Sequence, residues 1–340
     1  MINVGIAGAT GYTGQELISL LTRHPMARIS ALFSTTEEPK PIAELIPEFK
    51  NRIDLICTKL NLQALISKCD FIFLALPHTV SMGITPKLLQ AKKKVIDLSG
   101  DYRIKDIKVY ERFYCHKQSD KINLKKAVYG LPELYRAGIK KADLVANPGC
   151  YSTAAILALT PIAAFDLADL DSIVIDAKSG VSGAGKKATA ELLFCEVNEN
   201  FMAYKINIHQ HIPEINQELS KLAGKKLNVT FVPHLLPLNR GILETIYIKK
   251  HPKAKNNGLK LLKLYRKFYK KEPFVRILDE GKFPRIKDVA YTNFCDIGIK
   301  EEPDKIIIIA AIDNLLKGAA GQAVQNMNIM CGFPEETALG

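Results

Sequence analysis

The sequence predicts an α/β protein of two domains. The first is expected to hold a doubly wound parallel sheet, and the second is expected to be an α+β domain with a mixed or antiparallel sheet. In the first half, continuous apolar runs alternate with helical patterns, as in parallel sheets that are covered on both faces. In the second half, runs rich in β-branched residues lie close together and helical patterns are fewer. The length of 340 residues is sufficient for two domains.

The elements of the first half follow from apolar runs and their period. A helix is predicted over Gly14–Arg23 because Leu17, Leu20 and Leu21 share one helical face. A second helix is expected over Met82–Ala91. The expected strands are Ile2–Ala7, Ala27–Phe33, Phe71–Leu76, Val95–Leu98 and Leu144–Ala146.

The second half is expected to form closely spaced strands with helices on one face. The strands are predicted at Ser172–Ala177, Asn228–Pro233, Leu243–Lys249, Thr292–Ile299 and Lys305–Ala311. The helices are predicted at Ala188–Glu196, Pro213–Ala223, Leu259–Tyr269 and, as a closing run of small residues, Leu315–Met330. We expect a cofactor-binding domain of residues 1–149 and 315–340, and a catalytic and oligomerisation domain of residues 150–314.

Composition and charge argue against several function classes. The net charge of +12 comes from scattered lysine pairs, which indicates a solvated basic surface and no nucleic-acid site. A positive field of this kind attracts phosphorylated, carboxylate-bearing small molecules. Seven cysteines without paired spacing indicate reduced thiols and no metal site. No leader precedes the first strand and no stretch is long enough to cross a membrane, so a cytoplasmic protein is expected.

A glycine-rich loop follows the first expected strand and opens a helix. It reads Gly8-Ala9-Thr10-Gly11-Tyr12-Thr13-Gly14. Glycines here allow a tight turn and let the backbone approach a pyrophosphate at the helix N-terminus. The spacing G-x-x-G-x-x-G in this strand–loop–helix context indicates a Rossmann-type dinucleotide site. The expected cofactor contacts are Gly8, Thr10, Gly11, Tyr12, Thr13 and Gly14.

The residues about 20 positions after the glycine-rich loop bear on the choice between NAD and NADP. An NAD site places an acid there for the ribose 2′-hydroxyl. This chain has Ser34, Thr35 and Thr36 instead, whose hydroxyls can donate to a 2′-phosphate, although Glu37 and Glu38 follow and weaken the inference. The sequence therefore favours NADP, with Ser34 and Thr35 as contacts.

Cys150 is the candidate nucleophile. It lies in Ala146-Asn147-Pro148-Gly149-Cys150-Tyr151, between a strand-like run and a helix-like run. Helix-terminal N–H groups and the helix dipole favour a thiolate at such a turn, and a thiolate is the nucleophile that acyl chemistry needs. Most free cysteines are small buried hydrophobes, but Pro148 and Gly149 indicate a shaped turn. We therefore interpret Cys150 as functional.

A thiol nucleophile needs a base, and the hemithioacetal that it forms needs a proton donor. His211 is the candidate, in His209-Gln210-His211-Ile212-Pro213-Glu214-Ile215, just before a helix that Pro213 opens. Polar residues before a helix start are typical of a site loop. His209 is the competitor of His211, and His78, which follows the end of a strand, is a candidate to line the cofactor cleft.

Two further glycine-containing turns are candidates for ligand contact. Ser179-Gly180-Val181-Ser182-Gly183-Ala184-Gly185-Lys186 follows a strand, lacks the P-loop ending, and is a candidate to approach a phosphate or the nicotinamide. The alternative is a flexible linker. Asp313-Asn314-Leu315-Leu316-Lys317-Gly318-Ala319-Ala320-Gly321-Gln322 carries glycines that permit ligand approach or close helix packing. The expected cofactor contacts from these turns are Ser182, Gly183 and Asn314.

Taken together, the motifs resemble those of the N-acetyl-γ-glutamyl-phosphate reductases, the arginine-pathway family of the semialdehyde dehydrogenase superfamily. The likeness covers nearly the whole chain. Its most specific part is Asn-Pro-Gly-Cys at 147–150 with His-x-His-x-Pro-Glu-Ile at 209–215. The other segments that carry it are Gly8–Gly14, Leu98–Arg103, Tyr129–Glu133, Ser179–Gly185, Arg240-Gly241 and Asp313–Gln325.

The resemblance implies NADPH-dependent reductive dephosphorylation of N-acetyl-γ-glutamyl phosphate to N-acetylglutamate 5-semialdehyde. Cys150 would form a thioester and His211 would act as acid and base. Arg103 looks like a phosphate-binding residue and Arg240 like a substrate-contacting one, the alternative for both being a surface ion pair. The other expected substrate contacts are Asn147, Ser179 and His209. The family also implies a homodimer or tetramer.

Two departures and several alternatives stay open. Ser152 stands where relatives often have proline, which bears on the start of the helix. Thr35 stands where relatives often carry arginine, which bears on the strength of NADP selectivity. The substrate could be aspartyl phosphate or N-acetyl-aminoadipyl phosphate, because one methylene changes discrimination by only about 1–3 kcal/mol. A non-catalytic dinucleotide-binding sensor or a basic nucleic-acid binder is the alternative from another class.

Overall fold

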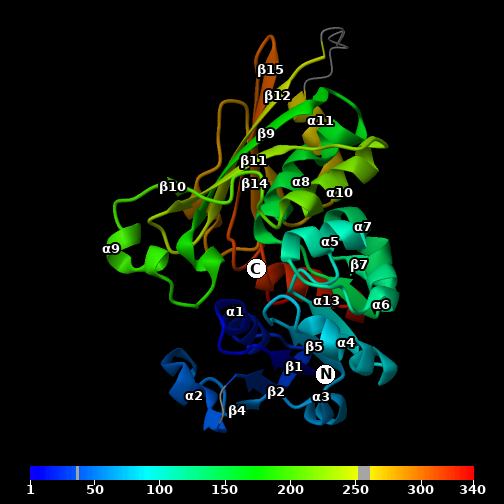
Figure 1. The fold of residues 1–340 in the computed structure, drawn as a ribbon, viewed down its shortest axis with the longest axis vertical. Helices are drawn as coiled ribbons and strands as arrows, with labels where there is room; N and C mark the ends of the chain where they lie inside the picture. Colours follow the sequence, from blue (N-terminus) through cyan, green and yellow to red (C-terminus); the bar gives the residue numbers. More distant parts are fainter. Residues whose placement is uncertain (36–37, 252–260) are drawn as a thin grey trace. The chain divides into compact units, whose positions relative to one another are not determined.

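The computed structural model describes residues 1–35, 38–251 and 261–340, and the chain divides into two compact units (Figure 1). The first unit comprises residues 1–148 and 319–340, and the second unit comprises residues 149–318. The C-terminal helix thus belongs to the same unit as the N-terminal strand.

A doubly wound sheet forms the centre of the first unit. Among its described residues, eight strands pair in the order β3-β4-β2-β1-β5-β6-β8-β7. Neighbouring strands are parallel except β3 and β4, which are antiparallel. The strand order reverses beside β1, so the carboxyl ends of β1 and β5 form a topological switch point. The strands are β1 (Ile2–Ala7), β2 (Ala27–Ser34), β3 (Lys40–Pro41), β4 (Ile56–Lys59), β5 (Phe71–Leu74), β6 (Lys94–Asp97), β7 (Val128–Tyr129) and β8 (Leu144–Ala146).

Helices pack on this sheet in separate groups. Helix α1 packs against α13, and α3 packs against α4. All four residues of β5 are buried, as the continuous apolar run in the sequence predicts for a central strand of a parallel sheet. The helices are α1 (Tyr12–Leu21), α2 (Ile42–Leu45), η1 (Pro47–Phe49), α3 (Leu62–Lys68), α4 (Ser81–Gln90), α5 (Ile107–Tyr114), α6 (Lys121–Lys126), α7 (Pro132–Ile139) and α13 (Ala320–Cys331).

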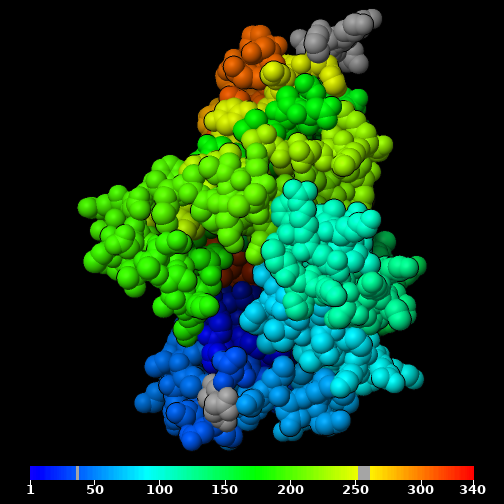
Figure 2. Space-filling model, in the orientation of Figure 1, coloured from blue at the N-terminus to red at the C-terminus, as the bar shows by residue number. Residues whose placement is uncertain are grey.

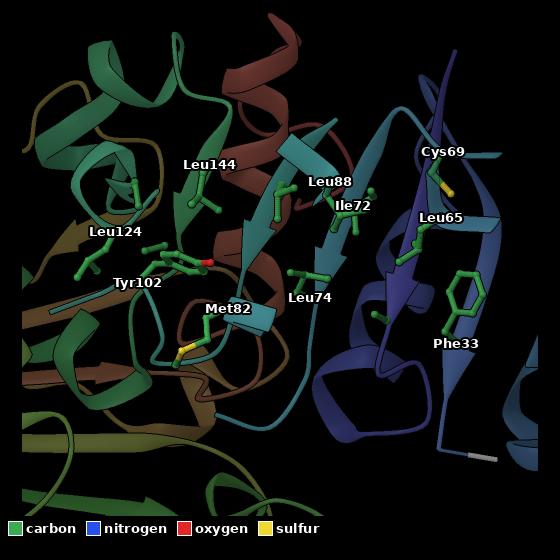
Figure 3. Close-up of a cluster of buried hydrophobic side chains, with 14 of the residues drawn as sticks. Phe33, Leu65, Cys69, Ile72, Leu74, Met82, Leu88, Tyr102, Leu124 and Leu144 are labelled. Carbon is green, nitrogen blue, oxygen red and sulfur yellow. The ribbon is translucent and has the colours of Figure 1, made fainter. Parts of the chain in front are cut away.

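One buried cluster runs along the sheet from β2 to β8. Figure 3 shows it from Phe33 and Leu65 at one side to Leu124 and Leu144 at the other. Tyr102, which is fully buried, lies among these aliphatic side chains and donates a 2.7 Å hydrogen bond to Asp120. The cluster includes Met82 and Tyr102 and so anchors to the sheet the segments that follow β5 and β6.

The second unit contains a mixed sheet with helices on one face. Among its described residues, seven strands pair in the order β10-β11-β9-β12-β15-β14-β13. The pairs β9–β11 and β13–β14 are parallel and the others are antiparallel. Alternate residues of β12 are buried because helix α8 packs on that face. The strands are β9 (Asp169–Gly180), β10 (Met202–Ala203), β11 (Thr230–Leu236), β12 (Ile242–Lys249), β13 (Val275–Ile277), β14 (Cys295–Glu301) and β15 (Lys305–Ile312).

Helix α8 is buried on nearly all sides and packs against α10. A helix that is apolar all round is expected to be enclosed by its own domain, and α8 shows this composition. The helices of the unit are α8 (Cys150–Ala164), η2 (Val181–Ala184), η3 (Ala190–Leu192), α9 (Phe194–Val197), α10 (Ile212–Ala223), α11 (Leu261–Phe268) and α12 (Ile286–Val289).

The structure confirms the predicted fold class and corrects two helices. The predicted helix Ala188–Glu196 is wrong, because the segment forms only the short turns η3 and α9. Leu193 is 55% and Phe194 78% exposed, so no apolar face is buried that would stabilise a longer helix. Figure 2 shows this segment, in green, projecting at the surface of the second unit.

The predicted helix Leu315–Met330 begins only at Ala320. The Asp313 carboxylate accepts the backbone N–H groups of Leu315 and Leu316 at 2.8 and 3.0 Å, which holds a turn where the sequence suggested helix. The predicted helix Leu259–Tyr269 corresponds to α11, but its first two residues lie outside the described residues.

Candidate active site

Cys150 is the first residue of α8 and is half-buried. Gly149 is the N-cap residue, with φ −71° and ψ 154°, and no side chain caps the helix. The first N–H groups of a helix have no intrahelical acceptor, so Cys150 stands at a helix end that offers hydrogen-bond donors. Ser152, at the position where relatives often have proline, lies within a regular helix start. Its buried hydroxyl has no hydrogen-bond partner among the described residues.

His211 lies against Gly149, the residue before the nucleophile. A Cβ atom at position 149 would be 2.3 Å from His211 Nε2 and 2.6 Å from Cδ2. Such distances are shorter than atoms tolerate, so only glycine leaves room for the imidazole at this place. The structure therefore brings the predicted pair Cys150 and His211 together, with Nε2 on the side of the helix start.

Glu214 also holds the turn at Gly149 in place, and it was not among the residues predicted from the sequence. It lies in the first turn of α10, is fully buried, and accepts the Gly149 N–H at 2.8 Å. The carboxylate thus fixes the residue that connects the strand to Cys150, while His211 from the same helix start packs against that residue. The signal was present in the sequence as an acid one helical turn after His211.

His209 positions His211 and stays neutral. Its Nδ1 accepts the backbone N–H of His211 at 3.1 Å, and the two rings meet edge to face with centroids 4.8 Å apart. Burial, with a smaller contribution from His211, lowers the pKa of His209 to about 2. A histidine with this pKa stays a neutral imidazole in the working range and does not cycle through the imidazolium, so His211 is the better candidate for acid–base chemistry.

Two tyrosines complete this side of the site and were also not selected from the sequence. The Tyr151 ring meets His209 and His211 edge to face, with centroids 5.4 and 6.0 Å apart. The Tyr204 hydroxyl donates to the Tyr151 hydroxyl at 3.3 Å. Burial raises the pKa of Tyr151 and raises that of Tyr204 to about 12, so both remain hydroxyl groups near neutral pH. The only sequence signal was the place of Tyr151 directly after the nucleophile.

The glycine-rich turn after β9 is held by hydrogen bonds. Asn314 accepts the Gly241 N–H at 2.7 Å and donates to the Ser182 hydroxyl at 2.9 Å. A Cβ atom at Gly183 would be 3.1 Å from Ser179 Oγ and 3.8 Å from Asn314 Nδ2. The structure thus brings together four predicted residues, and the interpretation of this turn as a flexible linker loses support.

Arg240 takes part in a buried ion pair next to this turn. Its Nη1 lies 3.3 Å from the Asp313 carboxylate, with the two side chains 11% and 0% exposed, and its guanidinium lies over the Tyr291 ring at 4.5 Å. The segment that begins at Asp313 continues to Gly318, which packs closely against Cys150. A Cβ atom added at Gly318 would be 2.7 Å from Cys150 Cβ. The alternative of a surface ion pair is therefore wrong for Arg240.

The glycine loop of the first unit fits a pyrophosphate. Gly8 has φ +92°, and a Cβ atom there would be 2.0 Å from the Ala75 carbonyl oxygen. A Cβ atom at Gly14 would be 2.2 Å from the Gly8 carbonyl oxygen. Gly11 is the N-cap of α1, without a capping side chain or an acid in the first turn, so the helix N-terminus presents its N–H groups to an anion. The other predicted residues of the loop surround this end: Thr10, Tyr12 and Thr13.

Ser34 and Thr35 differ in exposure. Ser34 ends β2, is 7% exposed and shares a side-chain hydrogen bond with Cys57. Thr35 is exposed, and Thr36 and Glu37 lie outside the described residues. Thr35 is thus the more accessible of the two predicted contacts to a 2′-phosphate.

Arg103 and Asn147 lie in the first unit and brace the end of β8. The Arg103 side chain is 4% exposed, and its Nε and Nη2 donate to the carbonyls of Asn147 and Leu98, each at 2.7 Å. The Asn147 amide donates to the Ala319 carbonyl and accepts from Asn326, each at 3.0 Å. Both residues therefore position the turn that leads to Cys150, and their contact with substrate stays a prediction.

Comparison with family models matches the chain in two parts. Residues 3–142 match the semialdehyde dehydrogenase NAD binding domain, and residues 150–314 match the semialdehyde dehydrogenase dimerisation domain. Among the described residues, no helix combines the length and apolar character that spanning a bilayer requires.

Individual relatives agree with these models. The chain is 48% identical to the N-acetyl-gamma-glutamyl-phosphate reductases of Geotalea daltonii and Desulforudis audaxviator, over 100% of this chain and 98% of each relative. Among solved structures it is similar to aspartate semialdehyde dehydrogenase II of Vibrio cholerae, in complex with ASA, with a TM-score of 0.72, 16% identity and coverage of 98% of both chains. The aspartate semialdehyde dehydrogenase of Candida albicans with NADP gives a TM-score of 0.72 and 16% identity over 97% of this chain and 98% of that one. These two structures support the fold alone.

Proposed function

The chain belongs to the N-acetyl-gamma-glutamyl-phosphate reductase family of the semialdehyde dehydrogenases, and from this membership we propose the reaction that it catalyses. It reduces N-acetyl-γ-glutamyl phosphate to N-acetylglutamate 5-semialdehyde with NADPH, a step of arginine biosynthesis. The observation that carries the proposal is Cys150 at the start of α8 with the His211 imidazole packed on the preceding Gly149.

Cys150 attacks the carbonyl carbon of the acyl phosphate. His211 takes the thiol proton, and the thiolate forms a C–S bond while the carbonyl oxygen becomes an oxyanion. The N–H groups at the start of α8 stabilise that oxyanion. When the oxyanion collapses, the C–O bond to phosphate breaks, a thioester on Cys150 remains, and inorganic phosphate leaves with one proton taken from solvent.

Reduction and release use the same two residues. NADPH, when held by the first unit, would supply the hydride that the Cys150 thioester needs to reach the aldehyde oxidation level. As the C–S bond then breaks, His211 returns its proton to the sulfur, which restores the Cys150 thiol and releases the aldehyde. His209 and Glu214 do not exchange protons in this scheme, and they hold His211 and Gly149 in place.

We assign cofactor binding to residues 1–149 with 315–340, and catalysis with oligomerisation to residues 150–314. In the first unit, Gly8–Gly14 would receive the pyrophosphate, with Ser34 and Thr35 near the 2′-phosphate. The remaining expected cofactor contacts are Ser182, Gly183 and Asn314 of the second unit. We expect the substrate to be bound by Ser179, His209, Arg240, Arg103 and Asn147.

We further propose a cytoplasmic homodimer or tetramer. The match of residues 150–314 to a dimerisation domain supports self-association. All seven cysteines are free thiols, which suits a reducing compartment.

The reverse reaction tests the proposal. The enzyme should reduce NADP⁺ with N-acetylglutamate 5-semialdehyde and phosphate, and Cys150→Ser should lose most turnover while still binding NADPH. Cys195→Ser, at an exposed thiol, is the control and should keep wild-type rates. Near-normal turnover of Cys150→Ser would reject the assignment. Parallel assays with aspartate and N-acetyl-aminoadipate semialdehydes identify the substrate length, and a higher kcat/KM with either would reassign the substrate.

A further inference from the structure

His78 lies at the switch point of the first sheet, outside the site described above. It follows β5, and its side chain is exposed. The same strand end packs on the glycine loop, since the Ala75 N–H donates to Ala7 at 2.8 Å and the Ala75 carbonyl closely faces Gly8. His78 is therefore three residues from the backbone that shapes the pyrophosphate loop.

Its ring has a defined tautomer. The Gly100 N–H donates to His78 Nδ1 at 2.9 Å, so Nδ1 is an acceptor and the hydrogen of the neutral ring is on Nε2. The ring meets Tyr114 edge to face at 5.0 Å, and Tyr114 stacks on Tyr110 at 4.8 Å. The orientation of the Nε2–H group is thus fixed by Gly100 and Tyr114, and Tyr110 supports Tyr114.

The backbone beside His78 is strained and held in place. Thr79 has φ +76°, a left-handed conformation that is rare for a β-branched residue. Asp101, which is fully buried, holds it by accepting the Thr79 N–H at 2.7 Å, the Met82 N–H at 3.1 Å and the Tyr110 hydroxyl at 3.0 Å. Strain of this kind persists where the surroundings impose it, and it is frequent at ligand clamps.

We propose that His78 binds the nicotinamide riboside half of NADP(H) through a hydrogen bond from Nε2–H. In doubly wound sheets the dinucleotide crosses the switch point at the carboxyl ends of the strands, with its adenosine half on the side of the second strand. Here that strand is β2, which ends at Ser34, so the other half extends over β5, where His78 stands. The inference rests on the proposed function, because it takes NADP(H) as the ligand.

Binding titrations of His78→Asn test the proposal. The asparagine carbonyl replaces Nδ1 as the acceptor for Gly100, while the Nε2–H donor is lost. NADPH affinity, measured by fluorescence, should fall about fivefold, the equivalent of one hydrogen bond. Affinity for 2′,5′-ADP, which carries only the adenosine half, should stay at the wild-type value. His116→Asn, at an exposed histidine of the same unit, is the control and should bind both ligands normally.

Each other result has a defined meaning. Unchanged NADPH affinity in His78→Asn overturns the role of His78 and leaves the proposed function intact. An equal loss of NADPH and 2′,5′-ADP affinity also overturns it, because the loop as a whole would then be disturbed. Absence of NADPH binding by the wild-type enzyme overturns the proposed function, and this inference with it.

Discussion

At the scale of single residues, Gly149 is the position where the site tolerates least change. We expect Gly149→Ala to lower kcat/KM by about 10²-fold, the size of effect that a misplacement of roughly 1 Å produces. The reason is that the added Cβ would overlap the His211 ring, which lies 2.3 Å away at Nε2. Steady-state kinetics of the purified variant measure this.

A second glycine-to-alanine change separates this effect from a general loss of stability. At Gly83, in α4, an added Cβ atom would meet nothing within 4 Å, so Gly83→Ala should keep full activity. If Gly149→Ala were as active as Gly83→Ala, the packing of His211 on the turn would have no role in catalysis.

The two histidines should differ in their effect on acylation. His211→Asn removes the proposed base, and we expect single-turnover acylation to slow by about 10²–10⁴-fold. His209→Asn keeps an acceptor near the Nδ1 position for the His211 N–H, so we expect a loss of about fivefold or less. Because the pKa of His209 is lowered to about 2, its variant should also leave the pH profile between about 5 and about 9 unchanged. Equal rates in the two variants would remove His211 from the mechanism.

Two sequence motifs predicted to carry the chemistry lie next to each other in the structure, and the catalytic roles of their residues stay predictions. Cys150 and His211 stand in recognisable turns, and the structure brings them together. Glu214 and Tyr151 were missed because their positions in the sequence, one helical turn after His211 and directly after Cys150, do not by themselves establish the contacts between α8 and α10 that give them their roles. Arg103 shows the reverse case, since its bonds to two backbone carbonyls give it a bracing role that the motif did not indicate.

At the scale of elements, the pattern of apolar residues predicted the strands more accurately than the first residues of the helices. The predicted strands Ile2–Ala7 and Leu144–Ala146 agree with β1 and β8 residue for residue. Helix α13 starts late because the side chain of Asp313 competes for backbone N–H groups, and such competition is not visible in hydrophobic spacing. The predicted helix Ala188–Glu196 was wrong because helical propensity without burial does not stabilise a helix.

Strand β12 contains a buried acid that should lower stability as pH rises. Glu244 is fully buried, neither carboxyl oxygen has a hydrogen-bond partner among the described residues, and burial raises its pKa well above 4.5 despite Lys178. Well below pH 4.5 both folded and unfolded chains hold the proton. As pH rises past 4.5 only the unfolded chain ionises freely, so the free energy of unfolding falls until the folded pKa is reached.

Two substitutions measure this effect. Glu244→Gln cannot ionise, so its Tm should equal that of the wild type near about pH 4 and exceed it increasingly up to about pH 8. Glu244→Met also removes the buried polar group, and we expect a further gain of about 1–3 kcal/mol. In a domain of about 150–250 residues each kcal/mol raises Tm by about 2–4 °C. A wild-type Tm that exceeds that of Glu244→Gln at the upper end of this pH range would contradict the interpretation.

At the scale of the whole molecule, the net charge of +12 should act on substrate capture. Both NADPH and an acyl phosphate that carries a carboxylate are anions, so a positive field raises their association rates. Raising salt from about 0.01 M to about 1 M shortens the Debye length from about 30 Å to about 3 Å and should remove this effect. We expect kcat/KM to fall about tenfold, the lower end of measured steering effects, while kcat changes little because it does not depend on encounter.

A charge-reduced variant is the matched control. The double substitution Lys270→Glu with Lys271→Glu, at two exposed residues, lowers the net charge by four and should reduce the salt dependence of kcat/KM. Equal salt dependence in the variant and the wild type would show that local contacts, and not the overall field, attract the substrates.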